Sequence, residues 1–219
     1  MIRSIALSIA LVAAAAPATA QLPRQDSAVL IVRQHGQLRG QEHFQLRATA
    51  SGGRLQARLN YIVSGHPVRQ TATLEWRAGA RLESYIWRQG TDAVTIGFAA
   101  GRLQAHYHPA HGATQVFQFQ LPPDTAILDA NVYSLWEPLA DRYVLARGGV
   151  QSFRVFVPHT GIPGHVRLTR LPVSGRDRAA GLVQLQAETG QATLFLTLRR
   201  GRLLTLRLPA AGLTVSRQR

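Results

Sequence analysis

The feature that most constrains this chain is a two-residue alternation of apolar and polar side chains in short segments between tight turns. Residues 193–199 read TLFLTLR and residues 202–208 read RLLTLRL, with Arg200 and Gly201 between them. Side chains two apart in a strand lie on the same face of a sheet, so these segments bury one face and leave the other in water. Evenly spaced strands joined by hairpins favour an antiparallel meander over a βαβ fold.

The same alternation predicts strands along most of the chain. They are expected at residues 27–34, 42–50, 54–63, 68–76, 82–89, 93–99, 102–108, 115–120, 151–157, 165–171, 182–187, 193–199, 202–208 and 213–215. Such a sheet exposes two edges unless it curls on itself or is covered. We therefore expect a mainly β protein whose meander forms an open or closed barrel with one short helix packed against it.

That helix is predicted at about residues 134–147. Ser134 and Glu137 match a capping box, in which the serine hydroxyl accepts a first-turn N–H and the glutamate reaches back. Gly148 and Gly149 then provide a C-terminal stop. The apolar stripe of this helix comprises Trp136, Leu139, Ala140 and Tyr143. A helix this short is marginal alone, so we expect it to plug the sheet.

The first 20 residues are predicted to be a secretory signal peptide. Arg3 precedes a short apolar stretch, and residues 18–20 (ATA) match a cleavage site between Ala20 and Gln21. The apolar stretch is too short to remain as a membrane anchor. We therefore expect a periplasmic or secreted protein with no transmembrane segment in its mature part.

The mature chain, residues 21–219, is predicted to be one domain. Its two β halves, at about 27–120 and 151–216, are separated only by a short Pro-rich connector and the helix, which needs both halves as packing partners. The chain has no cysteine, so no disulfide supports the fold and its stability depends on the core.

All 25 basic side chains are arginine, and the formal net charge is +14. Thirteen of these arginines follow Asp141, against only two acids. A field of this sign attracts anionic partners such as lipid phosphates and acidic glycans. We select Arg199, Arg200 and Arg202 as candidates for binding an anionic group. The alternatives are a solvated sheet exterior and a composition bias, while the export signal and the few aromatic residues among the arginines disfavour nucleic acid.

Four aromatic residues are candidates for lining a ligand pocket: Trp76, Trp87, Trp136 and Tyr143. Curled sheets of exported proteins often hold one apolar ligand. The alternative is that these side chains simply fill the core.

A histidine cluster is the sharpest candidate for metal binding. His106 and His108 share one face of a predicted strand, and His111 follows in the turn, so three imidazoles could hold a zinc ion. Against this, Leu103 and Ala105 are expected to face the core, which turns the histidines outward. No acid lies nearby in sequence to orient them. A polar hairpin end is the alternative.

No catalytic motif is found elsewhere. The chain lacks the G-x-S-x-G nucleophile elbow, and its acids are scattered. His159 and His165 flank a Gly/Pro loop that is typical of a surface loop. Asp129, Asn131, Glu137 and Asp141 are interpreted as caps and ion-pair partners that hold the helix. No cofactor is expected.

Several segments carry a resemblance to known proteins: the Gly-Gly hairpin before RLQARLNY, DANVYSLWEPLADRY, QSFRVFVP and the ending GRLLTLRLPAAGLTVSRQ. In pattern they resemble uncharacterised exported bacterial proteins with a curled antiparallel sheet of the lipoprotein-carrier (LolA/LolB) type. The resemblance implies a half-barrel or barrel whose concave face holds a lipid or a hydrophobic peptide segment. No catalytic residue is carried over.

These observations lead to one hypothesis and two alternatives. We expect a periplasmic protein that binds a hydrophobic or anionic amphipathic ligand, with a lipid or another anionic envelope component as its partner. The first alternative is an envelope hydrolase or metal-dependent enzyme that uses the histidine cluster. The second is an envelope interaction module that uses the basic C-terminal sheet.

Overall fold

The structure, a computed structural model, describes residues 24–63 and 65–218. The predicted signal peptide and its cleavage site between Ala20 and Gln21 lie outside the described residues. Within the described part of the chain, no helix is both long and apolar enough to cross a lipid bilayer.

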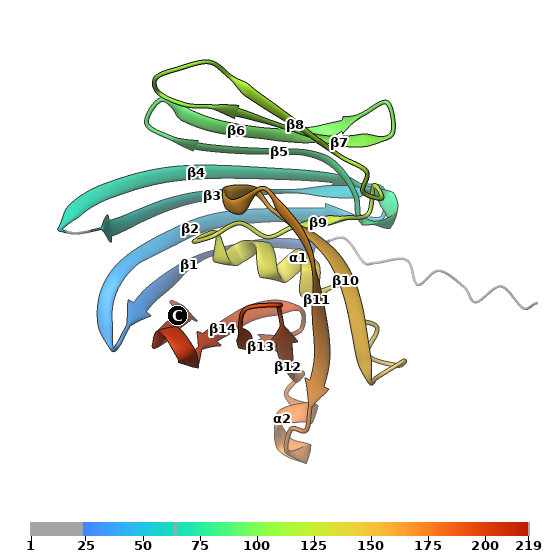
Figure 1. Cartoon of the computed structure of the whole chain (residues 1–219). Coiled ribbons are helices and arrows are strands. Elements are labelled where there is room, and N and C mark those ends of the chain that lie inside the picture. Colours follow the sequence, from blue (N-terminus) through green and yellow to red (C-terminus); the bar gives the residue numbers. More distant parts are fainter. Residues whose placement is uncertain (1–23, 64, 219) are drawn as a thin grey trace, which may run out of the picture.

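The described strands form a single sheet that curls around one short helix (Figure 1). The first eight are β1 (Arg24–Gln34), β2 (Gln37–Thr49), β3 (Gly52–Val63), β4 (His66–Arg77), β5 (Arg81–Gln89), β6 (Asp92–Ala99), β7 (Arg102–His108) and β8 (Gln115–Phe119). The others are β9 (Ala126–Ile127), β10 (Val150–Val157), β11 (Ile162–Leu171), β12 (Leu182–Glu188), β13 (Thr193–Arg199), β14 (Arg202–Leu208) and β15 (Leu213–Arg217). The predicted mainly β, antiparallel fold is therefore confirmed.

The two halves of the chain join through its first and last strands. β1 pairs antiparallel with β15, so that Leu30 lies opposite Arg217 and Val32 opposite Val215. The sheet order runs from β8 back to β1, then through β15 to β10 and β9, and only β9 and β10 pair in parallel. The sheet is not closed, because β8 and β9 are its two edges.

Alternation places the core as predicted, with one correction. Strict alternation along residues 82–89 predicts Leu82, Ser84 and Ile86 on one face, opposite Tyr85 and Trp87. A β-bulge instead pairs Trp76 with Leu82 and Glu75 with Ser84, which shifts the alternation after Leu82. Leu82, Tyr85 and Trp87 are consequently all buried.

The helix lies inside the curled sheet, between the arc of β1–β4 and strands β12–β14 (Figure 1). It consists of a 3₁₀ turn, η2 (Tyr133–Leu135), followed by α1 (Trp136–Ala140). The predicted apolar stripe is confirmed as buried. The helix is buried beyond that stripe, because the side chain of Glu137 is also fully shielded from solvent.

The prediction that this helix continues to residue 147 is wrong. The Gln151 side-chain amide accepts a hydrogen bond from the Val144 N–H at 3.0 Å and donates to the Val144 carbonyl at 2.8 Å. It also donates to the Gly148 carbonyl at 3.2 Å. These bonds satisfy the backbone in an irregular turn, so a continued helical ladder is not needed.

The predicted capping box is also wrong. The buried carboxylate of Glu42 accepts the N–H groups of Tyr133 at 2.8 Å and Ser134 at 3.1 Å, and so caps η2 from a strand. The Ser134 hydroxyl has no partner among the described residues, and Glu137 turns away toward arginines. A carboxylate from the distant strand β2 therefore takes the place of the predicted local cap.

Four short helical elements were not predicted. They are α2 (Gly175–Ala179), η1 (Ala78–Ala80), η3 (Pro158–Thr160) and η4 (Pro209–Ala211). The α2 helix is capped by Ser174, whose hydroxyl accepts the Asp177 N–H at 3.1 Å.

The antiparallel register defines two ends of the curled sheet. We call the end where β1 begins at Arg24 the arginine end, and the β13–β14 turn lies there as well. We call the opposite end, where β1 stops at Gln34 and β7 stops at His108, the tyrosine end. At this end Gln34 of β1 pairs with Leu213 of β15, and Leu213 also pairs with Leu208 of β14.

Candidate functional site

The arginine end carries a cavity of about 970 Å³, which we call the arginine pocket. Residues from β1, β13, β14 and β15 line it, and they include Arg24, Arg199, Arg200, Arg202, Leu204 and Arg217. The three arginines selected from the sequence therefore lie together, and two further arginines from the ends of the chain join them. No local pattern points to Arg24 and Arg217, because only the pairing of β1 with β15 places them here.

The β13–β14 turn presents three of these arginines within four residues. Arg199 pairs directly with Arg202, and the two residues between them, Arg200 and Gly201, have φ angles of 50° and 78°. Positive φ at both central residues is typical of a type I′ hairpin turn, a conformation that favours glycine. Like charges opposite each other in a sheet are destabilising. Repulsion between Arg199 and Arg202 therefore destabilises this turn, and a bound anion would reduce that repulsion.

The floor of the pocket is a network of buried ions. Arg217 donates from Nη1 and Nη2 to Asp26, at 3.1 Å and 2.7 Å, and from Nη2 to Glu137 at 2.7 Å. Arg24 binds Asp141 at 2.5 Å and also contacts Glu137. Buried charges are tolerated only when they are paired and hydrogen-bonded in this way. The network ties the helix region to β1 and β15.

Burial and the arginines act on these carboxyl groups in opposite directions. Burial acts to raise the pKa of Asp26, but hydrogen bonds and charge from Arg217 outweigh it and lower that pKa below its usual value. Burial raises the pKa of Glu137 to about 7 and that of Asp141 to about 6, against the charge of Arg24. Three acids face two fully engaged arginines, so the floor takes up a proton near neutral pH. The pocket therefore becomes more positive as the pH falls.

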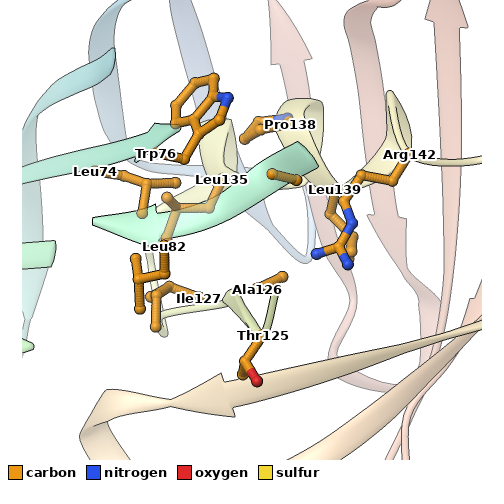
Figure 2. Close-up of a pocket in the computed structure, with 11 residues that line it drawn as sticks. Leu74, Trp76, Leu82, Thr125, Ala126, Ile127, Leu135, Pro138, Leu139 and Arg142 are labelled. Carbon is orange, nitrogen blue, oxygen red and sulfur yellow. The ribbon is translucent and has the colours of Figure 1, made fainter. Parts of the chain in front are cut away.

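The four aromatic candidates do not surround one volume. Trp76 lines a cavity of about 40 Å³ under α1, together with Leu82, Leu139 and other side chains shown in Figure 2. Trp87 lines a different pocket, at the tyrosine end. Trp136 and Tyr143 are buried in the core. Sites for small molecules are typically about 300–1,000 Å³, so the space under the helix is far below that range.

The histidine cluster is not assembled as a metal centre. The rings of His106 and His108 stack with their centroids 6.2 Å apart, and His108 Nδ1 lies 3.0 Å from the Thr114 hydroxyl. No group of three or more His, Cys, Asp or Glu side chains in the described ranges is arranged to hold a metal ion.

The tyrosine end contains a second polar cluster that the sequence did not indicate. The buried carboxylate of Asp129 is hydrogen-bonded by the Tyr85 hydroxyl and by Nδ1 of His159. The sequence pattern places His159 in a surface loop and Asp129 among the caps and ion-pair partners of the helix, but does not bring the two together. No sequence signal joins residues that lie on β5, on the connector after β9 and on η3, so this cluster depends entirely on the tertiary fold.

Fold and pocket together define a β-barrel-like protein with an arginine-lined pocket at one end. No family model matches the chain, and no curated protein matches it. In structure it is similar to a "Beta-barrel-like Protein of Domain of Unknown Function DUF1849" from Brucella abortus, with a TM-score of 0.56 and 10% sequence identity. The match covers 90% of this chain and 94% of that chain. At this identity the likeness shows the fold alone. The expected lipoprotein-carrier likeness is not confirmed.

Proposed function

We propose that this protein is an exported binding protein that holds the anionic group of an amphipathic envelope ligand, such as a lipid phosphate, in the arginine pocket. The observation that carries this proposal is a cavity of about 970 Å³ with five arginines in its lining. The predicted signal peptide supports a location outside the cytoplasm.

The arginines of the pocket divide into two groups. Arg24 and Arg217 are held by the buried acids and form a rigid floor. Arg202 lies 3.7 Å from Asp26, and no ion pair joins Arg199 or Arg200 to an acid in the described part of the chain. Arginine is well suited to bind phosphate because its planar guanidinium donates two parallel hydrogen bonds. The three arginines of the β13–β14 turn are therefore the ligand-binding group.

The apolar part of the ligand is placed outside the curled sheet. The cavity under α1 is about 40 Å³, which leaves no room there for an acyl chain. Recognition is thus of the head group at the rim, with Leu204 as an apolar contact beside the arginines. This differs from a carrier that encloses its whole ligand.

The proposal is tested by titrating inorganic pyrophosphate in a calorimeter and by measuring sedimentation with phosphatidylglycerol vesicles. The triple variant R199A/R200A/R202A is compared with R58A/R69A/R88A, which removes the same charge from exposed positions on β3, β4 and β5. We expect the first variant to bind at least about tenfold more weakly, since each charge-assisted hydrogen bond contributes about 1.5–3 kcal/mol. The second variant should lose much less affinity for either probe.

Two results would contradict the proposal. Equal losses in both triple variants would show that binding follows net charge alone, and no binding of either probe by the wild type would remove the site. Binding of pyrophosphate but not of vesicles would overturn the amphipathic part of the proposal and leave a site for soluble phosphates. Added salt should weaken specific binding, because the contacts at the rim are screened.

A further inference from the structure

The tip of the β10–β11 hairpin reaches across to the N-terminal strands at the tyrosine end. This tip is η3, and the Tyr107 hydroxyl of β7 donates to the Pro158 carbonyl at 2.5 Å. The ring of His159 packs edge-on against Trp87 of β5, with centroids 4.9 Å apart and planes at 81°. The imidazole is thereby packed against β5, and the hairpin tip that carries it is tied to β7.

Asp129 orients this imidazole. Its carboxylate side chain is fully buried, and its two oxygens are divided between the Tyr85 hydroxyl and Nδ1 of His159. Because Nδ1 donates to the carboxylate, the free lone pair of the neutral ring is on Nε2. The hydrogen bond that His159 donates to Asp129 outweighs partial burial and raises the pKa of His159 above its ordinary value. This arrangement is that of a base held by an orienting acid.

Asp129 differs from the other buried acids of the described residues. Asp26 and Glu137 are paired with arginine, and Glu42 is bonded to backbone N–H groups at the start of η2. The ionic partner of Asp129 is instead His159, a side chain that is 36% exposed. A buried carboxylate aimed at a partly exposed imidazole is an arrangement found at reactive sites.

A pocket of about 240 Å³ adjoins this imidazole. Its walls include Trp87, Val94, Tyr107 and Pro109, and His108 and Asp92 are further polar residues. Asp92 accepts the N–H of Ala110. Mostly apolar walls beside a base and an acid suit a small uncharged substrate that carries a short hydrocarbon group. This pocket lies at the opposite end of β1 from the arginine pocket and shares no lining residue with it.

We propose that His159 and Asp129 form a general-base dyad that hydrolyses small carboxylic esters in this pocket. Nε2 of His159 takes a proton from a water molecule as the water oxygen bonds to the ester carbonyl carbon, and the carbonyl π electrons move onto the carbonyl oxygen. When that intermediate collapses, the carbonyl double bond re-forms, the bond to the leaving oxygen breaks, and the alkoxide takes the proton back from Nε2. Asp129 stays ionised throughout and balances the imidazolium as a positioning residue.

The test measures hydrolysis of p-nitrophenyl acetate and p-nitrophenyl butyrate by the full protein between pH 5 and 9. We expect the rate to rise with pH through the pKa of His159, because only the neutral ring accepts a proton. His159→Gln should reduce the rate about a hundredfold or more, the usual contribution of a general base. His165→Gln is the matched control, since His165 is an exposed histidine of the neighbouring strand β11 and lies outside the pocket.

The variant Asp129→Asn tests whether Asp129 orients the His159 ring for reaction or only holds the ring in place. It should lower both the rate and the pKa of the His159 ring, which NMR titration of the imidazole follows independently of activity. Thermal unfolding shows whether each variant is folded. A wild-type rate no higher than that of His159→Gln would overturn the proposal whatever the melting temperatures, and so would an unchanged His159 pKa in Asp129→Asn. Neither result affects anion binding at the arginine pocket, so the two proposals fail separately.

Discussion

The two ends of the curled sheet stabilise buried carboxylates with different partners. At each end, carboxylates beside the central helix are shielded from water and need hydrogen-bond donors from the protein. At the arginine end, Glu137 is met by Arg24 and Arg217 and by the Leu203 N–H at 2.8 Å. At the tyrosine end, Glu42 is met by two backbone N–H groups alone.

The comparison shows how the choice of partner decides what an end can do. Full charges at the arginine end produce a strong field and a pocket that suits anions. The backbone donors around Glu42 carry no full charge, and burial raises the pKa of Glu42 to about 7 despite the hydrogen bonds from Ser134 and Tyr133. The four predictions below test this contrast, from the largest expected effect to the smallest.

The largest effect is expected from Arg217→Gln, which leaves the carboxylates of Asp26 and Glu137 without the arginine that they share. Breaking a buried pair from one side typically costs about 3–5 kcal/mol. Urea unfolding at pH 7.5 measures the loss in free energy. Arg77→Gln is the control, because Arg77 pairs with Glu83 on the surface, where water screens the attraction, so its loss should be small. A loss below about 1 kcal/mol for Arg217→Gln would show that the network does not hold the helix.

Glu42→Ala should cost less, about 1–3 kcal/mol, because the two N–H groups at the start of η2 lose their acceptor while no buried ion loses its partner. The same urea experiment measures the loss, and its ratio to the loss in Arg217→Gln sharpens the comparison. A larger loss than in Arg217→Gln would reverse the comparison and make the tyrosine end the stronger anchor of the helix.

Gly40→Ala tests the packing of the tyrosine end. A Cβ atom at residue 40 would lie 2.3 Å from the Asn60 carbonyl oxygen and 2.5 Å from the ring of Tyr61. Overpacking of this kind typically costs about 1–3 kcal/mol. Gly175→Ala is the control, since no atom lies within 4 Å of its added Cβ. Thermal unfolding of both variants checks the prediction, and equal melting temperatures would refute the close approach.

The smallest effect is on pH dependence at the arginine pocket. The folded-state pKa of Glu137 is raised from 4.5 to about 7, so its contribution to stability is fully present below pH 4.5 and is lost as the pH rises through 7. Protonation in this window also removes negative charge beneath the rim arginines. Pyrophosphate should therefore bind about threefold to tenfold more tightly at pH 5.5 than at pH 8, an effect on the order of 1 kcal/mol.

Two measurements isolate this effect from general protonation of histidines. The R199A/R200A/R202A variant reports the change in affinity that arises from the overall charge of the protein. A carbon-13 NMR titration of the Glu137 carboxyl group reports its protonation directly. If the pyrophosphate affinities of the wild type and of the triple variant change by the same factor between pH 5.5 and pH 8, the floor of the pocket does not control binding.

Much of the fold was predictable because local patterns decide it. The alternation in residues 193–199 and 202–208 and the turn at Arg200 and Gly201 predicted β13 and β14 at their observed bounds. The prediction was wrong where a distant partner competes with a local motif. Glu42 replaced the Ser134 cap, and Gln151 ended the helix early.

The candidate site was only partly predictable for the same reason. Arg199, Arg200 and Arg202 are adjacent in sequence, so a local charge cluster was enough to select them. Arg24 and Arg217 lie at opposite ends of the chain, and Asp129 and His159 are separated by irregular segments. Those groups meet only after β1 pairs with β15 and the β10–β11 hairpin reaches β5 and β7.

By itself, the sequence determined that the chain forms an antiparallel meander around one short helix, because side-chain periodicity and turn chemistry act over a few residues. Only the tertiary structure decided which charges are buried, what neutralises them and where pockets open. Those properties depend on low-dielectric surroundings and on donors from remote strands, and periodicity along the chain carries no information about either.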